Sequence, residues 1–267
     1  MIRSATPADF DAIAAIAAVY GFDEPDSGVD VAYLHLVMRT GRLAVAEVRT
    51  EVGPVVVGFG GTVDSFGAAM VTDLFVLEQF HGRGLGGRLL QHLVGDRSQR
   101  MTFSSNHPAA LPTYQRLGMQ PRWRLRYLRG GIRHLQHRVD VVEVVDVSPE
   151  MWAGSRRELA HHWRRRDARL LHIGDALDPT GTAIVTHDDR SWTLQRMETR
   201  GDHATAMASV MAALPERDAL TTFVPAWSHA ATLLDDLDFE ELDHDVCCTT
   251  ADVVIPSTAV VLHPALA

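Results

Sequence analysis

The sequence predicts an α/β (α+β) protein of two domains, each with a mixed, mostly antiparallel central sheet flanked by helices. Three observations predict this class. Segments in which apolar residues alternate, as in strands, are interspersed with segments at helical spacing. The order of these segments in the second half of the chain repeats that of the first. The glycine pair Gly130-Gly131 marks the best boundary, which places the domains at residues 1–131 and 132–267.

The composition narrows the class of protein. Hydrophobic residues make up 46% of the 267 positions and charged residues 22%, as in an ordinary globular protein. The sequence shows no apolar run long enough to cross a membrane and no signal-peptide pattern, so we expect a cytoplasmic protein with no membrane partner. The net charge of −9 argues against nucleic acid as a partner. All 25 basic residues are arginines, which excludes lysine-centred chemistry. The two cysteines, Cys247 and Cys248, cannot form a metal site alone, and we expect no metal.

The elements of the first half follow from apolar periodicity and from cap residues. Thr6-Pro7 suits the cap and first turn of the first helix, and Gly118 suits the end of the last one. Strands are expected at 2–4, 43–49, 54–63, 69–77, 101–104 and 122–128, and helices at 9–18, 29–39, 85–94 and 108–117.

The second half repeats this order. Strands are expected at 139–147, 182–186, 191–197, 220–224 and 241–249, and helices from Ser148 onward, at 204–214 and at 228–237. An offset of 120 residues aligns the halves without a gap, so that Leu74 falls on Leu194 and Phe103 on Phe223. Apolar positions match by chance in any single register, and the matching order of elements is the stronger sign of a repeat.

A glycine-rich turn between a strand and a helix is the first candidate for chemistry. It reads His81-Gly82-Arg83-Gly84-Leu85-Gly86-Gly87 and follows the strand that ends near Leu77. Glycines let several N–H groups point into one concavity, and the helix start adds unpaired N–H groups and the positive end of its dipole. Such a turn can hold a pyrophosphate without a lysine. Glycine-rich turns are also common without any ligand, and this one is neither a P-loop nor a good dinucleotide fingerprint.

A second constellation follows about 20 residues later in the sequence. Asn106-His107-Pro108-Ala109-Ala110 opens a helix that carries Tyr114 and ends at Gly118. Taken alone, a tyrosine in this place is more often a core aromatic than a catalytic acid.

Together the two stretches resemble the GNAT superfamily of acyl-CoA-dependent N-acetyltransferases, over about residues 1–130. DLFVLEQFHGRGLGGRLL is similar to the family's Q/R-x-x-G-x-G/A loop, in the register His81-x-x-Gly84-x-Gly86. NHPAALPTYQRLGM is similar to its N-x-x-A and Y-x-x-x-G-F segments. Two departures stand out, since His81 replaces the usual Gln or Arg and Met119 replaces Phe. A register that starts at Gln79 would begin the helix too early.

The resemblance implies an N-acetyltransferase that uses acetyl-CoA as cosubstrate and a primary amine, of a small molecule, as acceptor. The amine would attack the thioester directly, Tyr114 would give a proton to the departing thiolate, and N–H groups near Phe75 and Val76 would stabilise the oxyanion. Asp73 would hold a cationic substrate or take its proton, unless it is an outward, solvated strand residue. The cosubstrate site implied by the resemblance comprises Leu74, Phe75, Val76, His81, Gly82, Arg83, Gly84, Leu85, Gly86, Gly87, Asn106 and Tyr114.

Other parts of the sequence bear on substrate and assembly. Glu24, Asp26 and Asp30 lie where the family usually builds its acceptor site, and acidic loops are also often merely solvated. Glu78 is expected to be structural or on the surface. The arginine-rich run at 156–166 is expected to be the solvated face of a helix. A non-catalytic acyl-CoA-binding sensor and an acetyltransferase of a peptide or protein amine are the alternative functions.

The second half lacks the features of the glycine-rich turn. At the 120-residue offset Gly82, Gly84 and Gly86 fall on Asp202, Ala204 and Ala206, and Tyr114 falls on Leu234. The second half is therefore expected to be a degenerate domain that cannot bind CoA in the usual way. It would cover the first domain as the second subunit does in dimeric relatives. The protein is expected to be either a monomer with pseudo-dimeric domains or a homodimer.

Overall fold

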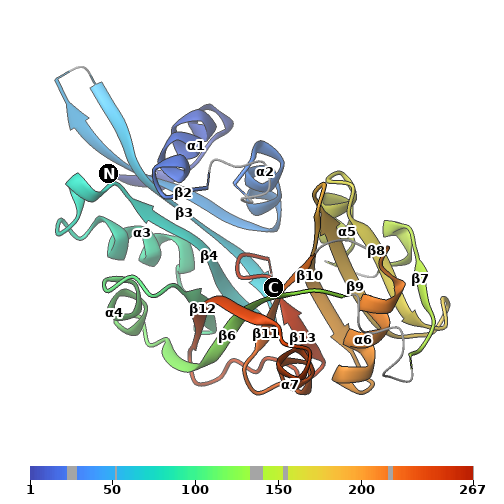
Figure 1. Ribbon diagram of the computed structural model, residues 1–267. Helices are drawn as coiled ribbons and strands as arrows, with labels where there is room; N and C mark the ends of the chain where they lie inside the picture. The colour runs from blue at the N-terminus through green and yellow to red at the C-terminus, as the bar shows by residue number, and fades with distance from the viewer. Residues whose placement is uncertain (23–28, 52, 133–140, 153–155, 216–218, 267) are drawn as a thin grey trace. The chain divides into compact units, whose positions relative to one another are not determined.

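The computed structural model describes residues 1–22, 29–51, 53–132, 141–152, 156–215 and 219–266, which fold into two compact units (Figure 1). The first unit comprises Met1–Pro121 together with Cys248–Val254 and Leu266. The second comprises Arg122–Cys247 and Ile255–Ala265. Near its end the chain therefore returns to the first unit, where the main-chain N–H of Thr250 donates to the carbonyl of Arg100 at 3.0 Å.

The first unit is built on a mixed sheet. Antiparallel pairing joins its first four strands, and the last two are parallel. In spatial order the strands are β1 (Ile2–Ser4), β2 (Gly41–Thr50), β3 (Gly53–Ser65), β4 (Ala68–Val76) and β5 (Arg100–Ser104). All five overlap the strands predicted from the sequence.

Helices cover both faces of this sheet (Figure 1). Neighbouring residues of β3 show the two sides, because a Cβ at Gly60 would meet Leu93 of one helix and a Cβ at Gly61 would meet Val37 of another. The helices are α1 (Phe10–Val19), α2 (Val31–Thr40), α3 (Leu85–Val94) and the short α4 (Ala110–Gln115), with 3-10 turns η1 (Pro7–Asp9) and η2 (Glu78–Phe80). The helix predicted at 108–117 is thus shorter than expected.

The second unit is also a mixed sheet with helices, so the predicted fold class is confirmed. Its strands are β6 (Gln120–Gly130), β7 (Val144–Asp146), β8 (Arg169–Gly174), β9 (Pro179–His187), β10 (Ser191–Thr199), β11 (Ala219–Pro225), β12 (Glu240–Thr249) and β13 (Ala259–Leu262). The spatial order is β12-β6-β11-β10-β9-β8-β7, and β13 pairs with β10. Neither β8 nor β13 was predicted from the sequence.

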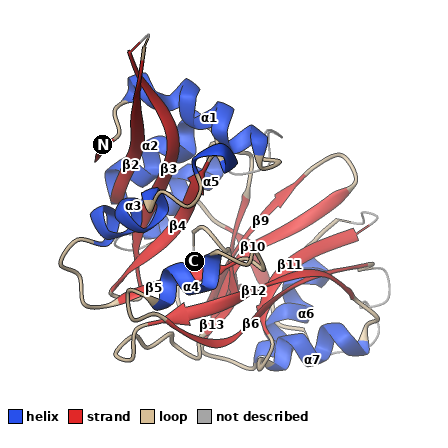
Figure 2. Ribbon diagram, turned by 90° about the vertical axis from the view of Figure 1, so that its left-hand side faces the viewer, coloured by secondary structure: helices blue, strands red, loops and turns tan. Residues whose placement is uncertain are grey.

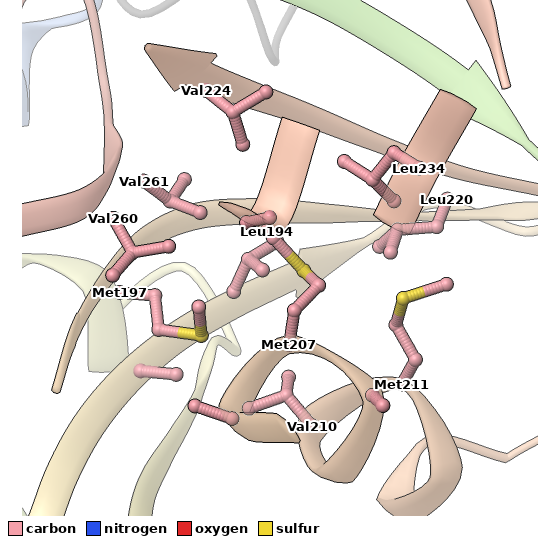
Figure 3. Close-up of a cluster of buried hydrophobic side chains, with 14 of the residues drawn as sticks. Leu194, Met197, Met207, Val210, Met211, Leu220, Val224, Leu234, Val260 and Val261 are labelled. Atoms are coloured by element: carbon pink, nitrogen blue, oxygen red, sulfur yellow. The ribbon is translucent and has the colours of Figure 1, made fainter. Parts of the chain in front are cut away.

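The helices of the second unit are α5 (Arg156–Arg164), α6 (His203–Ala213) and α7 (His229–Asp236), of which α6 and α7 pack together (Figure 2). Ser148 begins only the 3-10 turn η4 (Pro149–Met151) and not the expected helix. Part of the strand predicted at 139–147 lies outside the described residues. The core forms where Met207 and Met211 of α6 point toward Leu194 and Leu220 of the sheet (Figure 3).

From β2 to α4 and from β8 to α7, the two units repeat the same order of strands and helices. Their sequences, however, align only with a gap, which the ungapped alignment of the two halves did not include. Each unit has an extra, bulged residue in two consecutive strands, Val57 and Thr72 in the first and Thr180 and Gln195 in the second. Gln195 lies 123 positions after Thr72, and Thr180 lies 123 positions after Val57. The ungapped offset of 120 residues is therefore wrong for these strands, and the counterpart of Leu74 is Met197.

From the next strand onward the offset of 120 holds. Gly118 and Asp238, 120 positions apart, both have positive φ, at 81° and 58°. Met119 N–H donates to the Tyr114 carbonyl, and Phe239 N–H donates to the Leu234 carbonyl. The two units therefore differ in length between the bulge and the following helix. The N-cap Gly84 lies 12 positions after Thr72, whereas the N-cap Asp202 lies only 7 after Gln195, so this turn is 5 residues shorter in the second unit.

Candidate active site

An opening between β4 and β5 organises the candidate site. The two strands pair in parallel only from Ala69 to Val71 on β4 and from Arg100 to Thr102 on β5. The bulge at Thr72 follows at once and turns the rest of β4 away from its neighbour. The remaining residues of β4, up to Val76, therefore lie on a strand edge that β5 does not fill.

The main chain of β4 offers alternate residues to this edge. Leu77 N–H donates to the Val57 carbonyl at 2.9 Å, so Leu77 and, two residues earlier, Phe75 turn their polar groups toward β3. Leu74 and Val76 consequently turn theirs toward the opening. Of the two N–H groups that the resemblance associates with the oxyanion, the one of Val76 faces the open side.

Two side chains hold the carbonyl of Val76. The hydroxyl of Tyr20 donates to it at 2.5 Å, and His81 Nε2 lies 2.6 Å from it. The imidazole of His81, which replaces the family's Gln or Arg, thus ties the glycine-rich turn to the end of β4. The ring of His107 stands edge-on to that of His81, with 6.3 Å between their centroids.

The glycine-rich turn has the conformation that its sequence predicts. Gly82 and Gly84 have φ of +74° and +68°, a left-handed region that other residues adopt at a cost. At Gly82, Gly84 and Gly87 an added Cβ would meet nothing within 4 Å. The chain's own packing therefore leaves space beside these positions, and side chains there would fill it.

The start of α3 is suited to an anion. Its N-cap Gly84 provides no side-chain cap, and no acidic residue lies in the first turn, so the first N–H groups of the helix are not satisfied by a neighbouring carboxylate. Arg83 is exposed, and its guanidinium lies over the ring of Phe80 at 5.2 Å. Leu85 is buried and packs with Val76, which fixes the helix start against the end of β4.

Asp73 is buried, with 7% of its surface exposed, so the alternative of an outward, solvated residue is wrong. Its Oδ2 accepts hydrogen bonds from the hydroxyls of Tyr33 at 2.5 Å and Thr72 at 2.7 Å. Burial raises the pKa of Asp73, while these two hydrogen bonds act in the opposite direction. Gly61 makes room for the group, because a Cβ there would lie 2.6 Å from Thr72 Oγ1.

Aromatic rings pack around Phe75, which directly precedes Val76 in β4. The ring centroids of Tyr20, Phe22 and Phe59 lie 5.1, 5.3 and 5.3 Å from that of Phe75. Tyr20 and Phe22 are 36% and 38% exposed, so part of this aromatic surface faces solvent. Tyr20, Tyr33 and Gly61 were not predicted from the sequence, because their roles arise from contacts across the fold.

The second constellation lies on the segment that follows β5. Tyr114 is buried in α4, with 8% of its surface exposed, and its carbonyl accepts from Leu117 and Met119. Asn106 and His107 are exposed in the turn before this helix. The structure therefore brings Leu74, Val76, His81 and the glycine turn together around β4 and α3, and it places Tyr114 and Asn106 around α4.

The expected acidic acceptor loop is only partly described. Glu24 and Asp26 lie outside the described residues. Asp30 is the N-cap of α2 and accepts from Tyr33 N–H at 2.7 Å, which is a structural role. Glu78 is exposed in η2, and its charge adds to the burial that raises the pKa of Tyr20.

No helix among the described residues is long and apolar enough to cross a membrane.

The sequence was compared with protein families and with curated proteins. Residues 39–121 match the family model of the acetyltransferase (GNAT) domain. A search among curated proteins gave no match.

Similar solved structures extend over the whole chain. A candidate acetyltransferase from Pyrococcus horikoshii has 16% identity and a TM-score of 0.73, and the match covers 100% of this chain and 95% of that one. A tandem GNAT protein from the clavulanic acid biosynthesis pathway has 18% identity and a TM-score of 0.60, over 94% and 98% of the two chains. An N-acetyltransferase from Anabaena variabilis has 14% identity and a TM-score of 0.60, over 93% and 72%. At these identities the likeness is one of fold.

Proposed function

Because residues 39–121 match the family model of the acetyltransferase (GNAT) domain, we propose that the first unit moves an acetyl group from acetyl-CoA to a primary amine of a small molecule. One observation carries this proposal. The edge of β4 left open by β5 leads directly to the uncapped, glycine-lined start of α3. An extended arm that ends in a pyrophosphate needs these two features side by side.

The residues that would hold acetyl-CoA fall into two groups. The main-chain groups of Leu74 would bind the extended arm along the strand, the Val76 N–H would hold the acyl carbonyl oxygen, and Phe75 would line the acyl end. The pyrophosphate would lie on the N–H groups of the turn and of the first turn of α3, with His81 fixing that turn on β4. Acetyl-CoA supplies the activated acyl group. The residues of this second group are His81, Gly82, Arg83, Gly84, Leu85, Gly86 and Gly87, and Asn106 would contribute from the turn before α4.

The transfer needs three things from the protein. The Val76 N–H would stabilise negative charge on the carbonyl oxygen while the amine nitrogen bonds to the acyl carbon and the carbon–sulfur bond breaks. Asp73 would receive the amine's proton, directly or through water, on Oδ1, since the hydroxyls of Tyr33 and Thr72 both donate to Oδ2. Tyr114 would give a proton to the departing thiolate. Correct placement of the two reactants supplies much of the remaining acceleration.

The aromatic surface around Phe75 favours a cationic acceptor. An ammonium group is attracted to aromatic faces, and Tyr20 and Phe22 present such faces beside the strand end. When ionised, the buried carboxylate of Asp73 would accept the proton that the ammonium group of the acceptor loses. A panel of polyamines, amino acids, aminoglycosides and peptides, assayed by thiol release from acetyl-CoA, would identify the acceptor and test the alternative of a peptide or protein amine.

The alternative of an acyl-CoA sensor is favoured by the burial of Tyr114, which is only 8% exposed. The variant Tyr114→Phe separates the two functions. For the enzyme we expect turnover to fall at least about tenfold while the Kd for CoA stays within about twofold, because only the hydroxyl that protonates the thiolate is lost. The matched control is Tyr127→Phe in the second unit, which should change neither value. Equal turnover in Tyr114→Phe would remove Tyr114 from the mechanism, and tight binding without turnover on any amine would favour the sensor.

A further inference from the structure

The C-terminal strand β13 occupies a distinctive place in the second unit. There β10 pairs in parallel with β11 only from Ser191 to Leu194. From Arg196 to Glu198 the same edge of β10 pairs with β13 instead, in the antiparallel direction. The strand β13 therefore fills the space that opens where β11 leaves β10.

This space is the counterpart of the opening in the first unit. At the offset of 123 residues fixed by the bulges, Val71 corresponds to Leu194, and each is the last residue of its strand to pair with the parallel neighbour. Val76 corresponds to Thr199. The N–H of Thr199 donates to the carbonyl of Thr258, just before β13, at 2.9 Å. The Val76 N–H faces the opening in the first unit, whereas the N–H of its counterpart Thr199 is bonded to a carbonyl of the same chain.

Side chains anchor β13 firmly. Val260 and Val261 are fully buried and lie in the same core cluster as Met197 and Val224 (Figure 3). His263, directly after the strand, packs against the rings of Trp163 and Phe223, with centroids 5.6 and 5.8 Å apart. Because both valines are fully buried, removing them from water stabilises the strand as part of the core.

The N-terminus of α6, the helix that follows β10, is capped by a side chain of the protein. Asp202 is the N-cap of α6, and its carboxylate accepts from Thr205 N–H at 2.8 Å. That hydrogen bond lowers the pKa of Asp202, so the group is an anion at neutral pH. In α3 the N-cap is Gly84, which has no side chain to do this. The turn before α6 is 5 residues shorter than the turn before α3, as counted from the two bulges.

We propose that the second unit carries in its own chain substitutes for the two parts of acyl-CoA that the first unit takes from solution. The strand β13 replaces the extended amide-bearing arm along β10, and the Asp202 carboxylate replaces the pyrophosphate at the start of α6. The inference rests on the proposed function only in taking acyl-CoA as the ligand of the first unit. Its consequence is that each chain binds one acyl-CoA and that β13 does not leave its place during binding or turnover.

A reversible cross-link tests whether β13 is a permanent occupant. Met197 and Val261 are opposite each other in the antiparallel register, so Met197→Cys with Val261→Cys should form a disulfide that locks β13 on β10. Mass spectrometry would assign the bond and show that the buried Cys247 and Cys248 remain reduced. Calorimetric titration with acetyl-CoA is expected to give one site per chain in the original protein and in the locked protein, with Kd values within about twofold. The same double variant kept reduced is the matched control.

Two results would overturn the proposal. One is two acetyl-CoA sites in the original protein, reduced to one by the lock. The other is a loss of binding or turnover of more than about fivefold in the locked protein relative to its reduced form. Either would mean that β13 is a displaceable strand.

Hydrogen exchange gives a readout that does not depend on the proposed function. The peptide that covers residues 257–263 is expected to exchange as slowly as one from the core of β10, and at the same rate with and without acetyl-CoA. Rapid exchange of this peptide without ligand, or faster exchange when acetyl-CoA is added, would overturn the proposal. If the original protein bound no acetyl-CoA at all, the proposed function would fail, while slow exchange would still support β13 as a fixed occupant.

Discussion

The hydroxyl of Tyr33 donates a hydrogen bond of 2.5 Å to Asp73 Oδ2, and both side chains are buried. The contact joins α2 to the bulged part of β4, 40 residues apart in the sequence. Burial raises the pKa of Asp73, and the hydrogen bond from Tyr33 lowers it because it favours the charged carboxylate. Tyr33 therefore lowers the pH at which the proposed base becomes available.

The variant Tyr33→Phe is expected to raise the pKa of Asp73 further, because a hydrogen bond to the ionised form is lost. A base works when it is ionised, so activity is lost as the pH falls through its pKa. We therefore expect the acidic limb of the pH profile of kcat/KM to move to higher pH by about one unit, which corresponds to about 1.4 kcal/mol. Assays of acetyl transfer from pH 4 to pH 9 would measure this shift.

The second unit provides a matched control for this variant. Tyr127 donates to Asp245 at 2.6 Å, which is a hydrogen bond of the same kind in a partly buried place. The variant Tyr127→Phe is expected to leave the acidic limb where it is. If Tyr33→Phe also left it unmoved while Asp73→Asn stayed active, Asp73 would not be the base.

Gly87→Ala is expected to separate stability from cosubstrate binding. Gly87 lies in the first turn of α3, and an added Cβ would meet nothing within 4 Å. Alanine in a helix is more stable than glycine by roughly 0.5–1 kcal/mol, so the Tm should rise or stay the same. If the pyrophosphate approaches this turn closely, the added methyl group should raise the Kd for acetyl-CoA about tenfold.

Gln91→Ala, an exposed change later in the same helix, is the control and should leave the Kd unchanged. Thermal unfolding and calorimetric titration of the two variants would measure both quantities. Binding as tight in Gly87→Ala as in the original protein would place the pyrophosphate elsewhere.

Asp9 connects the start of α1 to the sheet and makes the stability of the folded protein depend on pH. Arg3 forms hydrogen bonds to Asp9 and Glu47, and the bond to Asp9 is the main reason that the pKa of Asp9 is lowered to about 2. A lowered pKa stabilises the folded protein above the unfolded value of 3.8, and the contribution disappears as the pH falls toward 2. We expect Asp9→Asn to lower the free energy of unfolding by roughly 1–2 kcal/mol at pH 7.

Urea titrations at pH 7 and at pH 2.5 would measure this contribution. The difference between Asp9→Asn and the original protein should be smaller at pH 2.5. Asp11→Asn, on the exposed side of α1, is the control and should have little effect at either pH. A difference that does not change with pH would mean that packing, and not the charge of Asp9, stabilises this region.

The local features of the fold could be predicted from the sequence, because they depend on neighbouring residues. The apolar spacing of α3 gave the bounds Leu85–Val94, and the glycines before it gave the turn with its two positive φ angles. The strand β8 could not be recognised, because its residues continue from a basic helical segment with no glycine or proline between them. Its start is set by Asp167, which adopts φ of 56° without being a glycine.

The features that depend on distant contacts could not be predicted. The bulge at Thr72 depends on the register of β4 against β3, and only its match with the bulge at Gln195 shows that these two strands are 123 positions apart. The burial of Asp73 depends on Tyr33 and on the space left at Gly61. The alternation of side chains along β4 assigns Asp73 to one face of the sheet, but the neighbouring residues do not show which helix covers that face.

His263 is expected to make the stability of the second unit depend on pH in the mildly acidic range. Burial, with the charges of Arg166, His162 and Arg196, lowers the pKa of His263 to about 3, and its Nδ1 accepts from Ala265 N–H at 3.0 Å. The folded protein therefore keeps this imidazole neutral, whereas the unfolded chain takes up a proton below its ordinary value of 6.5. Stability should thus fall as the pH drops from 6.5 toward 3, by roughly 1–2 kcal/mol at pH 5.

The variant His263→Asn removes the titrating group and retains an acceptor, so the free energy of unfolding should change less between pH 7 and pH 5. The comparison concerns this pH dependence, since the smaller side chain will also lower stability at pH 7 through lost packing. His229→Asn is the control, because that side chain is 81% exposed and should leave the dependence unchanged. Denaturant titrations at several pH values, followed by tryptophan fluorescence, would measure all three proteins. A pH dependence that is the same in His263→Asn and in the original protein would mean that His263 is already solvated in the folded state, and with it the segment that follows β13.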